Sequence, residues 1–460
     1  MSEKLFGTDG VRGIPGTPPL TPDMVRGIAA VAARLLHERG SARVNGRGPF
    51  IVVGRDTRGS GPEIMKQLVD GFATSGVLAL DLGVIPTPAV SYLTPRLGAI
   101  GGAVISASHN PAEFNGIKFF DADGFKMAPS LEDEIEQHLH QNRSHPRNPA
   151  KGVRQAVDAS AEAQHYIEFL RSTFPATLDL SGMKLVVDCA NGSAYKIAPA
   201  LFEALGAKVY PLSCRPNGKN INDNCGAMHP HDLRKAVVRL KADAGICFDG
   251  DADRCLFCDE KGDLIDGDSL ICLGAERLWR SGLLRNGKVV LTVMSNFGLI
   301  KSLRDKGIDV VSVPVGDRNV TEAIEKEDLS IGGENSGHII YRRFAVTGDG
   351  ILTALQTLAA LRESGLPLSR LRKTFRAVPQ VIENLHIKLK PPLASLAHLQ
   401  REVLRCERLL KGEGRIFLRY SGTEPLLRIL VEGPSRPQVA AMAKSLARVF
   451  LAETKQTQKL

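Results

Sequence analysis

The sequence predicts an α/β protein of several domains, with a separate α+β domain at its C-terminal end. The chain has 460 residues, which at roughly 150 residues per domain corresponds to about three domains. Short apolar runs rich in β-branched residues alternate with helical stretches, a pattern typical of βαβ units and mainly parallel sheets. Near residue 379 this pattern changes to a strand, a helix, two strands and a helix, which indicates the α+β domain.

Composition sets the broad class of the protein. Hydrophobic residues make up 43% and charged residues 24%, so the chain can fill several packed cores. No run approaches the roughly 18 apolar residues of a bilayer span, and MSEKLFGTDG lacks the order of a signal peptide. Among the eight cysteines only Cys255 and Cys258 are closely spaced, and nothing completes a zinc set. We therefore expect a cytoplasmic protein with reduced thiols and no membrane contact.

The net charge of +9 is compatible with nucleic acid, an anionic surface or a phosphorylated substrate. The basic residues are scattered along the chain, and aromatic residues make up only 5%, which leaves no stacking platform. We expect a small anionic partner and no nucleic acid.

Residues 21–40 predict the first helix. Thr21 can cap it, Pro22 takes the first helical position and Gly40 ends it. Apolar side chains recur at helical spacing and would share one face, at Met24, Ile28, Val31 and Leu35.

Four apolar runs predict strands that each end in a polar loop. They lie at residues 50–53 before GRDTRG, 185–187 before DCANG, 245–248 before DGDADR and 289–293 before MSNFG. Ligands of parallel α/β sheets collect beyond the carboxyl ends of the strands, so these loops are the expected sites of chemistry.

Three boundaries divide the predicted domains. The segment 140–152 has two prolines and no periodicity, and it is the best linker candidate. The loop DGDADR is expected to close one sheet before a new unit starts at Leu264. The predicted domains are residues 1–150, 151–256, 257–375 and 376–460.

The loop DGDADR carries the strongest local signal. Asp249, Asp251 and Asp253 stand at alternate positions and can converge on one hard cation, either Mg²⁺ or Ca²⁺. An EF-hand fails because Arg254 stands at position six, where glycine is needed. A solvated acidic loop is the alternative, but three clustered carboxylates without a cation repel one another.

The segment SASHNP follows the apolar run 101–105. A serine at a turn beyond a strand can act as a nucleophile, which makes Ser108 a candidate. A purely structural turn, with Ser108 and Asn110 bonding their own backbone, is the alternative. The acyl-transfer pattern GxSxG is absent, so a hydrolase triad has no local support.

Two further loops suit a sugar phosphate. In RYSGTEPLLR, Ser421 and Thr423 stand between arginines, which suits a phosphate group, although an ordinary hairpin loop is the alternative. In GGENSGH, Glu334 and Ser336 stand beside glycines, which suits sugar hydroxyls.

Together, SASHNP, DGDADR, GENSGH and RYSGTEP, in this order, resemble the α-D-phosphohexomutase family over essentially the whole chain. The segments FGTDGVRG, VDCANG and VGDRNV resemble the bacterial branch of that family that acts on hexosamine phosphates. The resemblance implies three similar α/β domains and a smaller fourth domain around a central cleft.

The resemblance also implies residue roles. Ser108 would carry the transferable phosphoryl group as a phosphoserine and would bind Mg²⁺ together with Asp249, Asp251 and Asp253. The accessory groups around the reacting oxygens would be Arg12, His109, Lys118 and His338. The groups that bind the substrate would be Arg254, Glu334, Ser336, Arg419, Ser421, Gly422, Thr423 and Arg428.

The implied activity is an intramolecular phosphotransfer. A hexosamine 6-phosphate would become the 1-phosphate through a 1,6-bisphosphate, with glucosamine or glucose 1,6-bisphosphate as activator, as a supply step for UDP-N-acetylglucosamine. Mannose or glucose phosphate is the alternative substrate within the family. A metal-dependent phosphatase and a non-catalytic sugar-phosphate sensor are alternatives from other classes, and a homodimer is left open.

Overall fold

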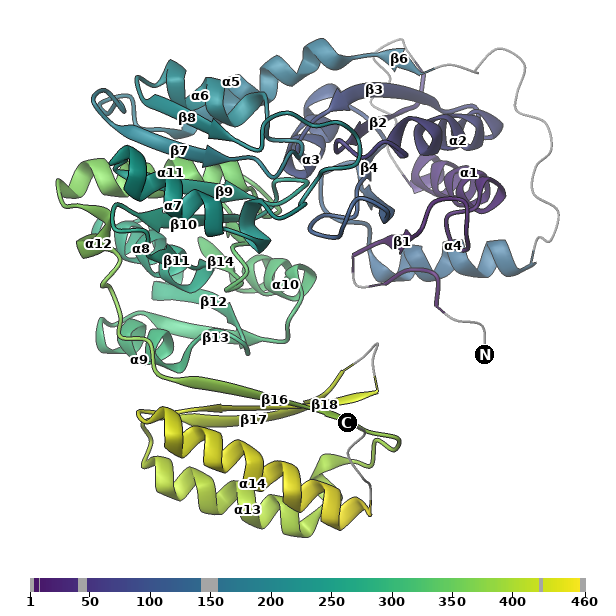
Figure 1. Cartoon of the computed structure of the whole chain (residues 1–460). Coiled ribbons are helices and arrows are strands. Elements are labelled where there is room, and N and C mark those ends of the chain that lie inside the picture. The colour runs from purple at the N-terminus through teal and green to yellow at the C-terminus, as the bar shows by residue number, and fades with distance from the viewer. Residues whose placement is uncertain (1–3, 8, 40–47, 142–155, 422–424, 456–460) are drawn as a thin grey trace. The chain divides into compact units, whose positions relative to one another are not determined.

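The computed structural model describes residues 4–7, 9–39, 48–141, 156–421 and 425–455. The chain divides into two compact units, one of residues 1–293 and 309–373 and the other of residues 294–308 and 374–460. Figure 1 labels most of the helices and strands of both units.

The first sheet of the larger unit has the strand order β1-β5-β4-β2-β3-β6. Its strands are β1 (Val11–Gly13), β2 (Phe50–Arg55), β3 (Leu78–Val84), β4 (Gly101–Ile105), β5 (Asn115–Phe120) and β6 (Val157–Asp158). The helices of this region are α1 (Pro22–Arg39), α2 (Gly61–Thr74), α3 (Thr87–Leu97) and α4 (Pro129–Gln141). The predicted cap of the first helix is confirmed, because the Thr21 hydroxyl accepts the backbone N–H of Met24 at 3.3 Å. Gly40 and most of the predicted linker lie outside the described residues.

The second sheet has the order β11-β10-β9-β7-β8. Its strands are β7 (Lys184–Asp188), β8 (Lys208–Leu212), β9 (Ala244–Phe248), β10 (Cys255–Asp259) and β11 (Leu264–Ile265). Its helices are η1 (Ser160–Glu162), α5 (Ala163–Thr173), α6 (Ile197–Ala204), η2 (Gly226–Met228) and α7 (His231–Leu240). Because β9 and β10 pair antiparallel, residues 249–254 are the turn of a hairpin. This sheet therefore runs past residue 256 to Ile265, whereas we expected DGDADR to close it.

The third sheet has the order β13-β12-β14-β15. Its strands are β12 (Lys288–Thr292), β13 (Asp309–Val313), β14 (Ile331–Gly333) and β15 (Ile339–Tyr341). Its helices are α8 (Gly267–Arg280), η3 (Arg285–Gly287), α10 (Asp317–Glu327), α11 (Gly350–Ser364) and α12 (Leu368–Leu371). Parallel pairing of β12 with β13 and β14 confirms the expected βαβ character of this region.

The smaller unit is the α+β domain. Its strands are β16 (Gln380–His386), β17 (Arg415–Tyr420) and β18 (Leu426–Glu432), and its helices are α9 (Phe297–Asp305), η4 (Leu393–Ser395), α13 (Ala397–Leu410) and α14 (Arg436–Thr454). Figure 1 shows α13 and α14 side by side along the sheet, with Leu399, Leu427 and Phe450 fully buried between these layers. The sequence did not predict that α9 belongs here; its first residue, Phe297, donates its N–H to the buried carboxylate of Glu432 at 3.0 Å.

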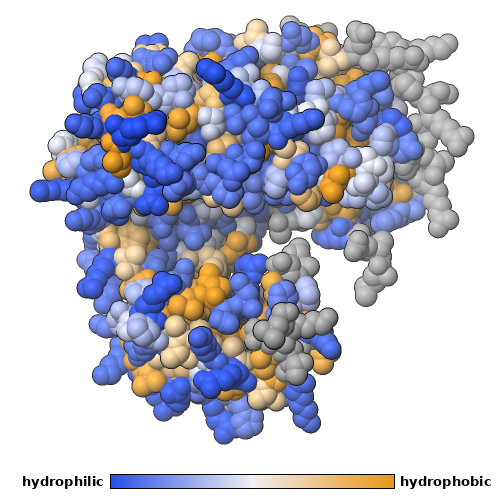
Figure 2. Space-filling model, viewed as in Figure 1, coloured by the Kyte–Doolittle hydropathy of each residue, from blue (hydrophilic) through white to orange (hydrophobic). Residues whose placement is uncertain are grey.

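These sheets and helices confirm the predicted fold class. Hydrophilic side chains dominate the visible face in Figure 2, because most large apolar residues are buried. All eight cysteines are free thiols in the structure. Within the described ranges, no helix is both long and apolar enough to cross a membrane.

Candidate active site

Ser108 lies in the loop that follows β4, and its side chain meets the acidic loop of the second sheet. The residue is 1% exposed, and its φ of 51° is left-handed, a conformation that few non-glycine residues adopt. Its hydroxyl donates to Oδ2 of Asp249 at 2.7 Å and lies 3.3 Å from Nδ1 of His109. Two motifs separated by 141 positions are thus in direct contact.

The buried guanidinium of Arg58 fixes the backbone of this serine loop. Its Nε donates to Asp56 at 2.9 Å, and Asp56 also accepts the Ser106 hydroxyl at 2.6 Å. The other guanidinium nitrogens donate, at 2.8 to 3.0 Å, to the carbonyl oxygens of Ser108, Asn110 and Phe114. An ion pair that is buried and hydrogen-bonded in this way holds a single loop conformation.

The β9–β10 turn gathers the three aspartates. Asp249, Asp251 and Asp253 are 0%, 1% and 4% exposed, and one carboxylate oxygen from each lies within 4.8 Å of the others. The loop is therefore buried, although a loop of this composition is expected at the surface. Thr87, at the start of α3, donates its hydroxyl to Oδ2 of Asp251 at 2.7 Å and so orients that carboxylate.

The unused oxygens of this loop fit a hard cation. Oδ1 of Asp251 and Oδ1 of Asp253 are buried and accept no hydrogen bond. Burial, and then the neighbouring carboxylates of Asp253 and Asp251, raise the pKa of Asp249 well above its usual value. An oxygen-only donor set with two free carboxylate oxygens suits Mg²⁺.

Lys118, on β5, is the cation that the chain itself places beside this loop. Its Nζ lies 3.0 Å from Oδ2 of Asp251, 3.0 Å from Oδ2 of Asp9 and 3.7 Å from Oδ2 of Asp253. Burial alone would lower the pKa of Lys118, but the carboxylates of Asp251 and Asp9 outweigh it and raise this pKa. Lys118 is therefore protonated at neutral pH. Arg12, on β1, forms an ion pair with the same Asp9.

The two predicted histidines differ in their surroundings. Burial, and then the guanidinium groups of Arg254 and Arg12, lower the pKa of His109 to about 4, so its imidazole is neutral at neutral pH. His338 lies just before β15, where Gly348 donates its N–H to Nε2 at 3.1 Å. Its other ring nitrogen, Nδ1, lies 3.6 Å from Asp253.

The GGENSGH loop joins β14 to β15 and contacts the acidic loop. Glu334 accepts the N–H of Gly316 at 2.9 Å and the hydroxyl of Ser336 at 3.4 Å. The carbonyl oxygen of Gly337 accepts the N–H of Cys255 at 3.0 Å. The backbone N–H of Arg254 donates to Oδ1 of Asp249 at 3.2 Å. The carboxylates near the guanidinium of Arg254 include that of Glu334. These residues therefore lie near the three aspartates in the larger unit.

The RYSGTEP residues belong to the smaller unit. Arg419 on β17 pairs directly opposite Arg428 on β18. Burial, and then the positive charge of Arg428, lower the pKa of Arg419. Ser421 is buried, and Lys390 donates to its carbonyl oxygen at 2.7 Å. Gly422 and Thr423 lie outside the described residues.

Sequence reasoning missed the residues that position the site. Arg58 and Asp56 stand in GRDTRG, a loop that we singled out only as a strand end. Asn222 was not noticed, although its side-chain amide donates to the carbonyl oxygens of Ser108 at 2.9 Å and Asn110 at 3.0 Å. The sequence shows these residues only as part of polar loops after strands. Such a loop indicates where a site lies but not which residues contact one another there.

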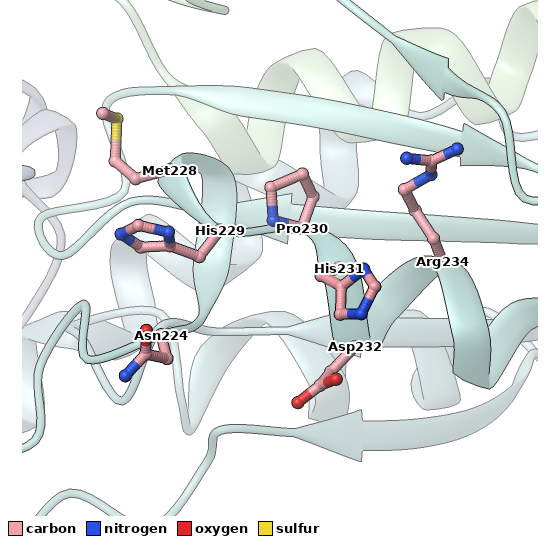
Figure 3. Close-up of a pocket in the computed structure, with 7 residues that line it drawn as sticks. All are labelled: Asn224, Met228, His229, Pro230, His231, Asp232 and Arg234. Atoms are coloured by element: carbon pink, nitrogen blue, oxygen red, sulfur yellow. The ribbon is translucent and has the colours of Figure 1, made fainter.

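A cavity lies at the start of α7 in the larger unit (Figure 3). His229 and His231 line it, but their rings do not converge with Asp232 on one point. In the described part of the chain, the only cluster of three or more potential metal ligands is formed by Asp249, Asp251 and Asp253. The cavity therefore has no part in the candidate site.

Four family descriptions match the chain in order. Phosphoglucomutase/phosphomannomutase alpha/beta/alpha domain I matches residues 3–146, domain II residues 164–262, domain III residues 266–378, and the C-terminal domain residues 371–449. The chain belongs to the phosphoglucomutase/phosphomannomutase family, the α-D-phosphohexomutases, as its motifs predicted. It is an enzyme, an isomerase that works by phosphotransfer.

Within this family, the chain is 43% identical over 445 residues to the phosphoglucosamine mutase of Pelobacter propionicus, an alignment that covers 96% of this chain and 97% of that one. A phosphoglucomutase/phosphomannomutase family protein from Burkholderia thailandensis has the same fold, with a TM-score of 0.79, 24% identity, and 100% and 99% of the two chains covered. Aspergillus fumigatus N-acetylphosphoglucosamine mutase, solved with GlcNAc-6P and magnesium, matches with a TM-score of 0.63, 18% identity, and 98% and 96% coverage.

Proposed function

We propose that this enzyme interconverts glucosamine 6-phosphate and glucosamine 1-phosphate through a phosphoserine at Ser108 and a 1,6-bisphosphate intermediate. The observation that carries the proposal is the 2.7 Å contact between the Ser108 hydroxyl and Asp249, which sets the phosphoryl carrier against the acidic loop. The 43% identity to a phosphoglucosamine mutase over nearly the whole chain supports glucosamine phosphate as the substrate. The product would enter UDP-N-acetylglucosamine synthesis in the cytoplasm.

Asp249, Asp251 and Asp253, with the phosphate on Ser108, would hold Mg²⁺. When bound, the ion would offset negative charge on the phosphoryl group and so favour its transfer. The free oxygens of Asp251 and Asp253 support this assignment. Glucosamine or glucose 1,6-bisphosphate would restore the phosphoserine whenever it is lost.

The transfer takes place in two balanced halves. First, the P–O bond to Ser108 breaks, a P–O bond to the C1 hydroxyl of glucosamine 6-phosphate forms, and the hydroxyl proton returns to the serine oxygen. The bisphosphate then reorients, the P–O bond at C6 breaks, a P–O bond to Ser108 forms, and the serine proton passes to the C6 oxygen, which leaves the 1-phosphate. The neutral imidazole of His109, 3.3 Å from the serine oxygen, is suited to relay the proton at that atom. Lys118 already carries its proton and therefore contributes positive charge.

Further residues would bind the remaining parts of the substrate. Glu334 and Ser336 would hold sugar hydroxyls, and Arg12, Arg254 and His338 would surround the reacting oxygens. The non-transferring phosphate would be held by Arg419, Ser421, Gly422, Thr423 and Arg428.

Substrate choice is tested by a coupled assay with glucosamine, mannose and glucose phosphates. We expect kcat/KM for glucosamine phosphate to be higher by about tenfold or more, the effect of one charge-assisted contact of about 1.4 kcal/mol. Equal or faster turnover of mannose or glucose phosphate would identify the other branch of the family. Release of inorganic phosphate at the same rate as sugar phosphate is consumed would instead indicate a phosphatase.

The phosphate loop is tested by Arg419→Ala. This change removes a charge-assisted contact of about 1.5–3 kcal/mol, so we expect substrate binding to weaken by roughly tenfold to a hundredfold. Because the loop must hold the intermediate while it reorients, more bisphosphate should escape into solution. The matched control is Arg405→Ala, since Arg405 is 56% exposed and its ion pair is with Glu402 on the same helix. An unchanged KM and no added free bisphosphate in Arg419→Ala would count against the assignment.

A further inference from the structure

Two of the eight cysteines meet at the carboxyl ends of β7 and β8. These parallel strands pair Asp188 with Leu212. The backbone N–H of Cys189 and the thiol of Cys214 both donate to the carbonyl oxygen of Leu212, each at 3.1 Å. Both residues therefore meet at one carbonyl group, and each thiol alters the pKa of the other. Both thiols are free.

The two thiols differ in access and acidity. Cys189 is fully buried, whereas Cys214 is the only one of the eight cysteines, all of which lie in the described ranges, that is not buried. The hydrogen bond from Cys189 lowers the pKa of the Cys214 thiol, and burial raises the pKa of Cys189. Cys214 is thus the thiol that solvent-borne reagents reach and that ionises first.

The segment that follows Cys189 supports the acidic loop. Ser193 donates its N–H to the carbonyl oxygen of Gly250 at 2.8 Å. A Cβ on Gly192 would lie only 2.3 Å from that same oxygen, so the two backbones are in close contact. A shift of this segment would therefore reach the loop between Asp249 and Asp251.

The same segment supports the serine loop. Asn222 donates its backbone N–H to the carbonyl oxygen of Ala190 at 2.9 Å, and its side-chain amide donates to the carbonyl oxygen of Ser108 at 2.9 Å. One residue therefore joins the neighbour of Cys189 to the phosphoryl carrier.

The backbone between the two cysteines is held in an uncommon conformation. Ala190, Asn191 and Ser213 have φ values of 53°, 48° and 48°, in the left-handed region. Asn191 donates its N–H to the carbonyl oxygen of Ser213 at 2.6 Å, which ties the two turns together. Conformations of this kind persist only where the surrounding structure holds them, so a new covalent link between the two turns would disturb them.

We infer that Cys189 and Cys214 form a regulatory disulfide that lowers turnover when the protein meets a low-molecular-weight disulfide. The thiolate of Cys214 attacks one sulfur of RSSR, forms a mixed disulfide and releases RS⁻. Cys189 gives up its proton and attacks the Cys214 sulfur, which releases the second RS⁻. The protein loses two electrons and two protons, and the small disulfide becomes two thiols.

The test treats the full-length enzyme with oxidised glutathione, blocks remaining thiols and analyses the protein without reduction. We expect a mass loss of about 2 Da and one cross-linked peptide pair containing residues 189 and 214. Turnover should fall by roughly tenfold or more, because small displacements of reacting groups are costly, and a dithiol reductant should restore it. Cys214→Ser and Cys189→Ala should each abolish both the cross-link and the reversible loss.

Cys225→Ala is the matched control, because Cys225 lies in the same region, where the Asn191 amide contacts its sulfur at 3.9 Å, yet should take no part. A stable glutathione adduct on Cys214 without a cross-link, a disulfide that includes Cys225, or a cross-link with unchanged turnover would each overturn the inference. The mass and peptide readouts on the wild-type protein do not depend on the proposed function. Failure of the mutase assay before oxidation would contradict that function alone.

Discussion

Replacement of Ser108 by alanine is expected to lower turnover by roughly three orders of magnitude or more, because the variant lacks the hydroxyl that we propose as phosphoryl carrier. The loop should persist, since Arg58 binds the carbonyl oxygen of residue 108 and not its side chain. Intact mass should show one phosphate, about 80 Da, on the wild-type protein and none on Ser108→Ala.

The control for this change is Ser106→Ala. Ser106 is equally buried and lies two residues away, but its hydroxyl donates to Asp56 and not to the acidic loop. This variant should keep the added phosphate, whatever it loses in rate through a less rigid loop. Near-normal turnover of Ser108→Ala, or an added phosphate that persists in it, would exclude Ser108 as the carrier.

Periodicity and loop chemistry predicted most of the fold. The helix near residue 21 and the strands before each polar loop are local patterns, and local patterns are what a sequence displays. The sequence did not predict the β9–β10 hairpin. The apolar run after Arg254 indicates a buried strand, but a local pattern does not show which strand it pairs with. Helix α9 shows the same limit: an apolar face does not say which core it joins.

The candidate site divides along the same line. The side chains that we propose to carry the chemistry, such as Ser108 and the three aspartates, stand in short patterns that can be recognised. The groups that position them, such as Arg58, Thr87 and Asn222, act across 50 to 164 residues of sequence and have no local pattern. Only the folded chain brings them together.

Asp251→Asn is expected to remove the metal site while keeping the fold. Oδ2 of Asp251 accepts Thr87 at 2.7 Å and Lys118 at 3.0 Å, and an amide oxygen in that position can accept both. Lys118 also keeps its ion pairs with the carboxylates of Asp9 and Asp253. The amide NH₂ would then replace Oδ1, the oxygen left free for a cation. The change therefore deletes one ligand and one negative charge and disturbs little else.

We expect Mg²⁺ affinity, measured by calorimetry, to fall by roughly a hundredfold or more, and turnover by a similar factor. Because a ligand that binds only the folded state stabilises it, Mg²⁺ should raise the thermal midpoint of the wild-type protein but not that of the variant. Asp263→Asn is the control, since Asp263 follows β10 but is 54% exposed and pairs with Arg372. Unfolding of Asp251→Asn, or wild-type turnover that a chelator leaves intact, would mean that the three aspartates are structural. If Mg²⁺ affinity and turnover both fall in Asp251→Asn and not in Asp263→Asn, the three aspartates are the metal ligands on which phosphoryl transfer from Ser108 depends.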